Sequence, residues 1–345
     1  AVCAAFTALG RPGAGLPSVH VLGTNGKGST AALCAHALGR RRRVGLYTSP
    51  HLHRVGERIR VGGEAVEDAA LQGLVDRVLA VQGLPRPLTF FEVLTLAALL
   101  HFAASGAEVL VMEAGLGGRL DATRVLRHSV ALFTPIDLDH MSYLGADVVA
   151  IAGEKGAVLE DGAPAYSAPQ RPEVAMVLRE LASRWGVPLI FVEALPRPPV
   201  GLEGEHQRIN AALALAGARH LDPSISAEDL DGVRWPGRLE RRAIGEGVVI
   251  FDVAHNPHGV AALVAHLRGA PRAARVLLFG CLADKDAPTM LAALASLGAP
   301  LWVAPPPGAA PDLTALAAPH GADVFTGVDD PRLHGAIERW LAGGG

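Results

Sequence analysis

The sequence is poor in cysteine, in net charge and in long apolar runs. Its cysteines are Cys3, Cys34 and Cys281, too few and too scattered for a disulfide framework or a zinc site. The net charge is −3, so nothing indicates a surface for nucleic acid or for a membrane. The most apolar segment, residues 93–100, is far too short to span a bilayer. With no signal peptide visible, we expect a cytoplasmic protein.

Lysine is also scarce. Among 31 basic residues only Lys27, Lys155 and Lys285 are lysines, and all the others are arginines. Arginine keeps its proton and lacks a compact primary amine. Each remaining lysine is therefore a candidate for chemistry that arginine cannot perform, with chance as the alternative for any one of them.

The length and the hydrophobic content bound the architecture. A chain of 345 residues exceeds what one hydrophobic core usually supports, so two domains are expected. Half of the residues are hydrophobic, which is typical of well-buried α/β layers rather than of disorder. A turn-rich stretch around residues 222–234 predicts the boundary, with one domain over 1–232 and a second over 233–345.

The segment 19–30, Val-His-Val-Leu-Gly-Thr-Asn-Gly-Lys-Gly-Ser-Thr, has the order strand, glycine-rich turn and helix. The glycines let backbone N–H groups point at phosphate oxygens, and the helix presents its positive end there. Lys27 supplies a charge for the β- and γ-phosphates, and a hydroxyl at Ser29 or Thr30 can reach Mg²⁺. The segment therefore predicts a phosphate-binding loop; the alternative is a loop that only turns a strand into a helix.

Apolar strands and helical patterns alternate along the rest of the chain. Strands are expected at 44–47, 109–112 and 130–133, and helices at 31–38, 67–81 and 89–104. After the predicted domain boundary the alternation of strands and helices repeats, with strands at 248–251, 275–280 and 301–303. This alternation predicts a parallel sheet with helices on both faces. The fold class is thus α/β, with a P-loop parallel-sheet ATPase domain followed by a smaller, Rossmann-like domain.

Polar residues follow the predicted strands, where ligands gather in such sheets. Glu113 directly follows the strand 109–112, and a carboxylate there could bind Mg²⁺ or polarise water. The alternative is a helix-capping or salt-bridged glutamate. Asp139 and His140 follow the next strand, and spacing alone does not make His140 a ligand.

Thr89 and Glu92 have a local explanation. A threonine followed three residues later by a glutamate, ahead of an apolar run, is a capping box that opens a helix. The intervening pair Phe90 and Phe91 could also form the floor of a site for a flat aromatic substrate.

With these residues laid out, the sequence resembles the folylpolyglutamate synthase/dihydrofolate synthase family, within the Mur-ligase superfamily of ATP-dependent amide-bond ligases. The resembling motifs run in the family's order across nearly the whole chain, at 20–30, 48–52, 91–92, 113–123, 138–140, 154–155, 235–240 and 252–257. The loop 20–30 and the run Glu-Ala-Gly-Leu-Gly-Gly-Arg-Leu-Asp-Ala-Thr at 113–123 are the most specific. Arg124 stands where relatives have asparagine.

The resemblance implies a set of site residues. ATP contacts are expected from Gly26, Lys27, Gly28, Ser29, Asn210, Arg238, Asp252 and His255, and Mg²⁺ ligands from Ser49, Glu113 and His140. Pteroate binding is expected from Thr89, Phe90, Phe91, Glu92, Leu120, Asp121 and Ala122. Lys155 matches the lysine that reacts with CO₂ to form a carbamate, which arginine cannot do. Lys27, Lys155 and His140 are the expected catalytic residues.

The reaction implied is acyl activation by ATP. Lys27 and two Mg²⁺ ions would neutralise charge while the γ-phosphoryl group moves to a substrate carboxylate. The α-amine of L-glutamate would then attack the acyl phosphate, and Arg238 would complete the site when the second domain closes. The acceptor is dihydropteroate, a reduced folate or both, and we expect a monomer. Two alternatives stay open: another Mur-type ligase, and a switch or binding protein that hydrolyses ATP without ligation.

Overall fold

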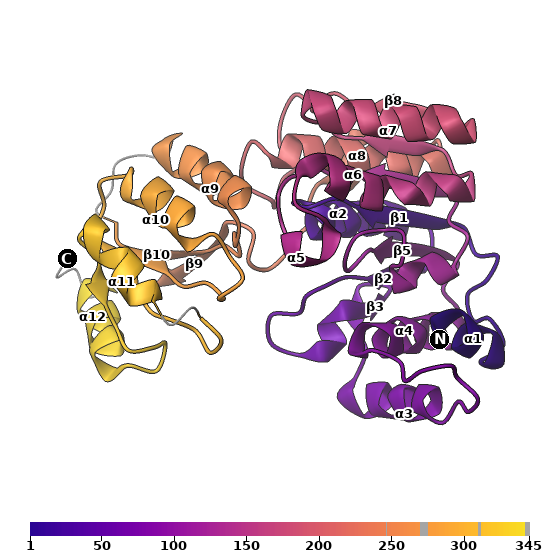
Figure 1. Ribbon diagram of the computed structural model, residues 1–345, viewed down its shortest axis with the longest axis horizontal. Coiled ribbons are helices and arrows are strands. Elements are labelled where there is room, and N and C mark those ends of the chain that lie inside the picture. Colours follow the sequence, from indigo (N-terminus) through magenta and orange to yellow (C-terminus); the bar gives the residue numbers. More distant parts are fainter. Residues whose placement is uncertain (246, 270–274, 310–311, 342–345) are drawn as a thin grey trace. The chain divides into compact units, whose positions relative to one another are not determined.

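The computed structural model describes residues 1–245, 247–269, 275–309 and 312–341. The chain divides into two compact units (Figure 1). The N-terminal unit comprises Ala1–Gly201 and His206–Trp235, and the C-terminal unit comprises Leu202–Glu205 and Pro236–Gly345. No helix of the described residues is both long enough and apolar enough to cross a membrane.

The N-terminal unit is built on an eight-stranded sheet of order β4-β3-β2-β5-β1-β6-β7-β8. Its strands are β1 (Ser18–Leu22), β2 (Val44–Tyr47), β3 (Ile59–Val61), β4 (Glu64–Ala65), β5 (Val109–Glu113), β6 (Val130–Phe133), β7 (Ala165–Ser167) and β8 (Leu189–Phe191). The six strands from β2 to β8 in that order run parallel, and only β3 and β4 are antiparallel. The central strands β1, β2, β5 and β6 are buried along their whole length, as the continuous apolar runs predict.

Helices cover this sheet (Figure 1). They are α1 (Val2–Ala8), α2 (Lys27–Gly39), α3 (Asp68–Leu79), α4 (Phe90–Ala104), α5 (Met141–Leu144), α6 (Val148–Gly156), α7 (Pro172–Trp185) and α8 (Gln207–Leu221). Short 3₁₀ turns are η1 (Val55–Arg58), η2 (Ala122–Val125), η3 (Ala157–Asp161) and η4 (Ala227–Leu230). Helices α2 and α8 pack on each other and on β5 and β6, while α3 pairs with α4 and α6 with α7.

The α/β class predicted from the sequence is confirmed. The strands expected at 44–47 and 130–133 have those bounds. Helix α2 begins at Lys27, four residues before the expected start at 31, because Gly26 adopts the left-handed backbone (φ 89°) and the helix follows at once. The hairpin of β3 and β4 was not predicted, since strands of three and two residues carry too little alternation to detect.

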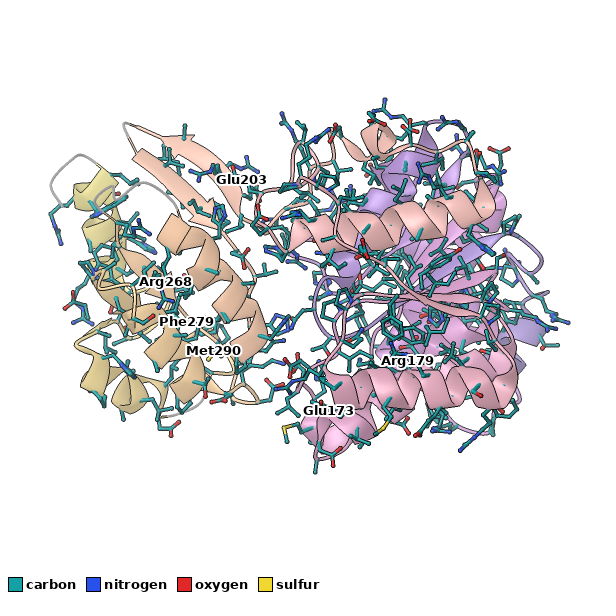
Figure 2. All side chains as sticks on the ribbon, turned by 90° about the horizontal axis from the view of Figure 1, so that it is seen from above. Glu173, Arg179, Glu203, Arg268, Phe279 and Met290 are labelled. Carbon is teal, nitrogen blue, oxygen red and sulfur yellow. The ribbon has the colours of Figure 1, made fainter. Side chains whose placement is uncertain are left out.

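The described residues of the C-terminal unit form two small sheets. Strands β9 (Glu240–Ile244) and β10 (Gly247–Phe251) form an antiparallel pair, and β11 (Leu277–Phe279), β12 (Leu301–Val303) and β13 (Asp323–Val324) form a parallel sheet in that order. The helices are α9 (Pro257–Gly269), α10 (Ala287–Ala295), α11 (Leu313–Ala317) and α12 (Pro331–Leu341), with the turn η5 (Ala318–His320). Phe279 of β11 and Met290 of α10 are buried in one core cluster of this unit (Figure 2).

Candidate active site

The phosphate loop joins β1 to α2 and is shaped by two glycines. Gly23 and Gly26 have φ values of 132° and 89°, which only glycine adopts without strain. A Cβ on Gly23 would collide with Thr134, and a Cβ on Gly26 would collide with the side chain of Asn210. The loop therefore fits tightly between β6 and α8. Lys27 Nζ donates to the carbonyl of Thr24 at 3.1 Å, within the loop itself.

Helix α8 brings a second polar residue to the same place. Asn210 Nδ2 donates to Gln207 Oε1 at 2.9 Å, and Gln207 Nε2 lies 3.4 Å from Ser29 Oγ. All three side chains are buried. The structure thus links the expected ATP contacts Asn210 and Ser29 through Gln207, although they are 181 positions apart in the sequence. Gln207 was not among the predicted site residues; its spacing of three from Asn210 on one helix face was the available signal.

Two of the expected Mg²⁺ ligands lie together at the carboxyl ends of neighbouring strands. Glu113 ends β5, and its Oε2 accepts a 3.1 Å hydrogen bond from the backbone N–H of Ser49, just beyond β2. Glu113 is only 3 % exposed. A buried carboxylate offers the hard oxygen atoms that Mg²⁺ prefers, and serine carries a hydroxyl oxygen of the same kind. The residues present therefore fit a magnesium ion.

His140 is the third expected Mg²⁺ ligand. It precedes α5 with a left-handed backbone (φ 52°), and its Nε2 is 3.9 Å from Asp139 Oδ1. Across the described part of the chain, no three His, Cys, Asp or Glu side chains are grouped so that they could hold a metal ion. The metal role of His140 stays a prediction.

Lys155 reaches the phosphate loop from the end of α6. Its Nζ donates to the carbonyl of Gly23 at 2.8 Å, and the residue is 5 % exposed. Burial, together with the charge of Lys27, lowers the pKa of Lys155 to about 7. A substantial fraction of the amine is therefore uncharged near neutral pH. An uncharged amine is a nucleophile, whereas an arginine at the same place would remain a cation.

Thr89 and Glu92 form the capping box that the sequence predicts. Thr89 Oγ1 accepts from the N–H of Glu92 at 3.2 Å, and Glu92 Oε2 accepts from the N–H of Thr89 at 2.8 Å. Arg86 adds two hydrogen bonds of 2.9 and 2.8 Å to the same carboxylate and lowers the pKa of Glu92 to about 2. These two expected pteroate contacts thus also anchor the start of α4. Arg86 itself was missed, because no sequence pattern singles it out.

The two phenylalanines between Thr89 and Glu92 have different surroundings. Phe90 is 60 % exposed, and the guanidinium of Arg58 lies 5.5 Å from its ring centroid. Phe91 packs 5.6 Å from the ring of Tyr47, and any Cβ on Gly115 would collide with the Phe91 ring. An exposed ring stacked by a cation is a suitable partner for a flat aromatic ligand.

The segment 113–123 joins several of these parts. Its Leu120 is 90 % exposed, whereas Asp121 and Ala122 are buried. A Cβ on Gly118 would lie 2.7 Å from the carbonyl oxygen of Lys155, so this segment packs directly on the backbone that carries Lys155. A shift of the backbone at Lys155 would therefore displace the segment that carries the expected pteroate residues 120–122.

In the C-terminal unit, the expected ATP contact Asp252 links the two segments that carry the other expected contacts, Arg238 and His255. Asp252 accepts from the N–H of Leu239 at 3.0 Å and from the N–H of Ala254 at 2.8 Å. It thereby ties the turn of Arg238 to the turn of His255, whose Nδ1 lies 2.9 Å from the carbonyl of Val253. The structure brings this group of residues together within its own unit.

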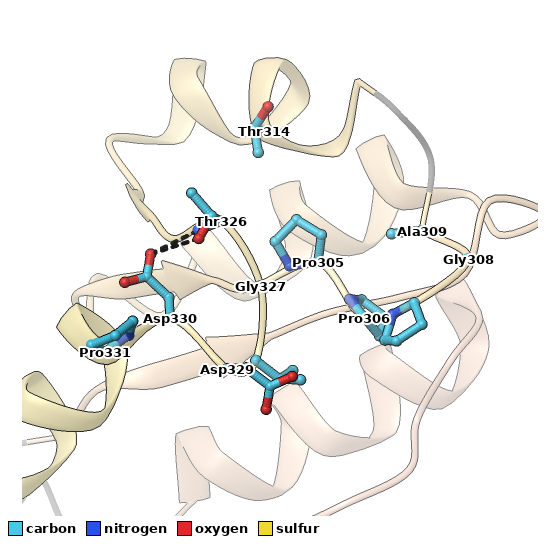
Figure 3. A pocket seen from close by; sticks show the side chains of 12 residues that line it. Pro305, Pro306, Gly308, Ala309, Thr314, Thr326, Gly327, Asp329, Asp330 and Pro331 are labelled. Carbon is cyan, nitrogen blue, oxygen red and sulfur yellow. Dashed lines mark hydrogen bonds between the residues drawn. The ribbon is translucent and has the colours of Figure 1, made fainter.

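A separate pocket of about 660 Å³ lies in the same unit, beyond the ends of β12 and β13 (Figure 3). One wall is the proline-rich run 305–309, and the other is the segment 326–331. Asp330 accepts from the N–H and the hydroxyl of Thr326 at 2.9 and 3.1 Å, which fixes the second wall. None of the residues predicted from the sequence lines this pocket.

Two family models match the chain. The Mur ligase middle domain matches residues 21–166, and the Mur ligase glutamate ligase domain matches residues 237–339. The first match contains the phosphate loop and Lys155, and the second contains Arg238 and Asp252. Each lies within one of the two units.

Curated proteins and solved structures agree with these models. The chain is 36 % identical to a dihydrofolate synthase/folylpolyglutamate synthase of Mycobacterium tuberculosis, over 85 % of this chain and 71 % of that protein. The protein of the same name from Escherichia coli is also 36 % identical, over 83 % and 72 %. The M. tuberculosis folylpolyglutamate synthase complexed with ADP and AMPPCP superposes with a TM-score of 0.87 at 32 % identity, covering 98 % of this chain and 86 % of that one. E. coli FolC in complex with DHPP and ADP gives 0.84 at 32 % identity, over 99 % and 85 %.

Proposed function

The chain belongs to the dihydrofolate synthase/folylpolyglutamate synthase family of Mur ligases, and on that premise we propose that it is an ATP-dependent ligase that adds L-glutamate to dihydropteroate, to reduced folates or to both. The substrate carboxylate would take the γ-phosphoryl group of ATP, which releases ADP. The amine of L-glutamate would then attack the acyl phosphate, forming the amide bond and expelling phosphate. The names of the relatives and their complexes with nucleotides support this assignment.

The observation that carries the proposal is the buried amine of Lys155 at the phosphate loop. Its Nζ is held 2.8 Å from the carbonyl of Gly23 and has a pKa of about 7. The uncharged amine can add to CO₂, which forms an N–C bond, releases one proton and converts the side chain to a carbamate anion. A protein that only binds nucleotide has no need for such a lysine.

The phosphate loop of the N-terminal unit would bind the phosphates of the nucleotide. Backbone N–H groups from Gly26 to Ser29 and the ammonium of Lys27 would hold the phosphates. Asn210, packed over Gly26, would contact the nucleotide from α8. Arg238, Asp252 and His255 stay expected nucleotide contacts of the family resemblance.

Ser49 and Glu113 would hold Mg²⁺, with His140 as a further ligand. When bound, the metal supplies positive charge that offsets the charge developing on the transferred phosphoryl group. The chain's own contribution is to fix the carboxylate, which it does through the Ser49 N–H. The exposed Phe90 and the segment 120–122 would bind the pteridine and benzoyl rings of the acceptor.

The proposal is tested by offering the purified protein ATP, L-glutamate and either dihydropteroate or tetrahydrofolate, with the products identified by mass spectrometry. We expect a product heavier than its acceptor by one glutamyl residue. If neither acceptor gains mass while ATP is still consumed, the protein is an ATP-hydrolysing switch rather than this ligase. If ATP is not consumed either, the ligase assignment fails outright.

A further inference from the structure

A buried chain of hydrogen bonds links β1 to the segment 113–123. His20, on β1, is 1 % exposed, and its Nε2 lies 2.7 Å from Thr123 Oγ1. Thr123 Oγ1 lies in turn 2.6 Å from Asp121 Oδ1. The three side chains form an imidazole–hydroxyl–carboxylate series that connects the strand of the phosphate loop to the expected acceptor-binding residues.

The direction of these hydrogen bonds follows from Asp121. Its Oδ1 accepts from the N–H of Thr123 at 2.9 Å and its Oδ2 accepts from the N–H of Leu116 at 2.9 Å, so the carboxylate is surrounded by donors. The Thr123 hydroxyl therefore donates to Asp121, and its oxygen is left to accept from His20 Nε2–H. This assigns the proton of the neutral His20 ring to Nε2. Burial lowers the pKa of His20, which keeps the ring neutral.

A second histidine contacts the backbone carbonyl of Thr123. The ring of His128 stacks on His20 with centroids 4.1 Å apart. Its Nε2 lies 3.0 Å from the Thr123 carbonyl, and its Nδ1 lies 3.1 Å from Ser18 Oγ. Thr123 is thus held by one imidazole at its hydroxyl and by another at its carbonyl. Burial of the two stacked imidazoles disfavours their charged forms, so both rings stay neutral in the folded protein.

We propose that His20 and Thr123 are positioning residues, which hold Asp121 and the segment 115–123 in the shape that binds the acceptor substrate. The identity of that substrate rests on the proposed function. Asp121 closes the segment by joining Leu116 to Thr123, and Leu120 is presented at the surface between them. Removing the Thr123 hydroxyl takes one donor from Asp121 and one acceptor from His20, so the side-chain link between Asp121 and His20 is lost.

The test compares Thr123→Val, Thr123→Ser and His20→Leu with wild type, and uses Ser167→Ala as the control. Ser167 is also a buried hydroxyl that both donates and accepts, at 2.9 Å to Ala168 O and 3.1 Å from Gln170 Nε2, but it belongs to β7. We expect Thr123→Val to raise the KM for dihydropteroate about tenfold, with the KM for ATP unchanged. Serine restores the hydroxyl and the wild-type KM. Because the residues act in series, the double variant His20→Leu/Thr123→Val has the KM of the single Thr123→Val variant.

Hydrogen exchange of the substrate-free protein provides a readout that does not depend on the reaction. In Thr123→Val the amides of Leu116 and Thr123 exchange about tenfold faster or more, while the amides of β1 keep their protection. A wild-type protein that turns over no acceptor refutes the proposed function, and the exchange result still decides the positioning role. The role is overturned if these two amides keep their protection in Thr123→Val, or if the KM values for ATP and dihydropteroate rise together.

Discussion

The backbone N–H of Ser49 donates to Glu113 Oε2 at 3.1 Å, and this bond joins the carboxyl ends of β2 and β5. The two residues are 64 positions apart, and only the strand order brings them together. The bond holds a buried carboxylate at the edge of the sheet where the phosphate loop begins.

Glu113→Gln should raise the Mg²⁺ concentration needed for half-maximal turnover by about tenfold or more, because a neutral amide is a weaker ligand for a hard cation. The measurement is a Mg²⁺ titration at saturating ATP. Glu108→Gln is the matched control, since Glu108 lies just before the other end of β5 and accepts from the N–H of Arg43 at 2.7 Å. An unchanged titration in Glu113→Gln would remove this residue from the metal site.

Lys155→Arg should lower turnover by about 100-fold or more, although the positive charge is retained. The guanidinium keeps its proton and cannot react with CO₂ as an uncharged primary amine does. Circular dichroism and the thermal midpoint establish whether the variant is folded. A folded Lys155→Arg protein with wild-type turnover would refute the carbamate role.

Gly118→Ala should also impair turnover, through the backbone rather than through a side chain. The new Cβ would lie 2.7 Å from the carbonyl oxygen of Lys155 and 3.0 Å from that of Glu154, so the end of α6 must move. Gly153→Ala in the same helix is the control, because a Cβ there meets no atom within 4 Å. We expect Gly153→Ala to be active and about 0.5–1 kcal/mol more stable, by helix propensity. Equal activity of the two variants would contradict the coupling between the segment 113–123 and Lys155.

Glu92→Gln should destabilise the protein by about 2 kcal/mol at pH 7, because it weakens both the capping box and the pair with Arg86. The pKa of Glu92 is about 2 in the folded protein, against an ordinary value of 4.5. A lowered folded pKa stabilises the protein above the unfolded pKa, and this contribution is lost as the pH falls from 4.5 towards 2. Urea unfolding of both proteins at pH 7 and pH 3 checks this: the difference between them should shrink at pH 3. A difference independent of pH would contradict the assignment.

The parts of the site that could be predicted from the sequence are those encoded locally. The phosphate loop, the apolar strands and the capping box of Thr89 and Glu92 each occupy a short continuous run whose pattern fixes its structure. The place of Glu113 could also be predicted, because it directly follows the apolar run 109–112 and parallel strands end at a common edge of the sheet.

The rest depends on strand order and on contacts between distant segments. His20 and Thr123 are 103 positions apart, and no spacing rule links them. Gln207 meets Ser29 across 178 positions, through the packing of α8 on α2. The bond from Lys155 to Gly23 likewise spans 132 positions. The sequence pointed to Lys155 through the scarcity of lysine and through a family resemblance, but the burial that lowers its pKa appears only in the folded chain.

A ligase of this kind couples the consumption of ATP to the formation of an amide bond. The measurement is the ratio of ADP released to amide formed by the purified protein, with L-glutamate and the acceptor each present or withheld. We predict one ADP for each amide, and almost no ADP when either partner is withheld. ADP release that continues at the same rate without L-glutamate would contradict the ligase mechanism.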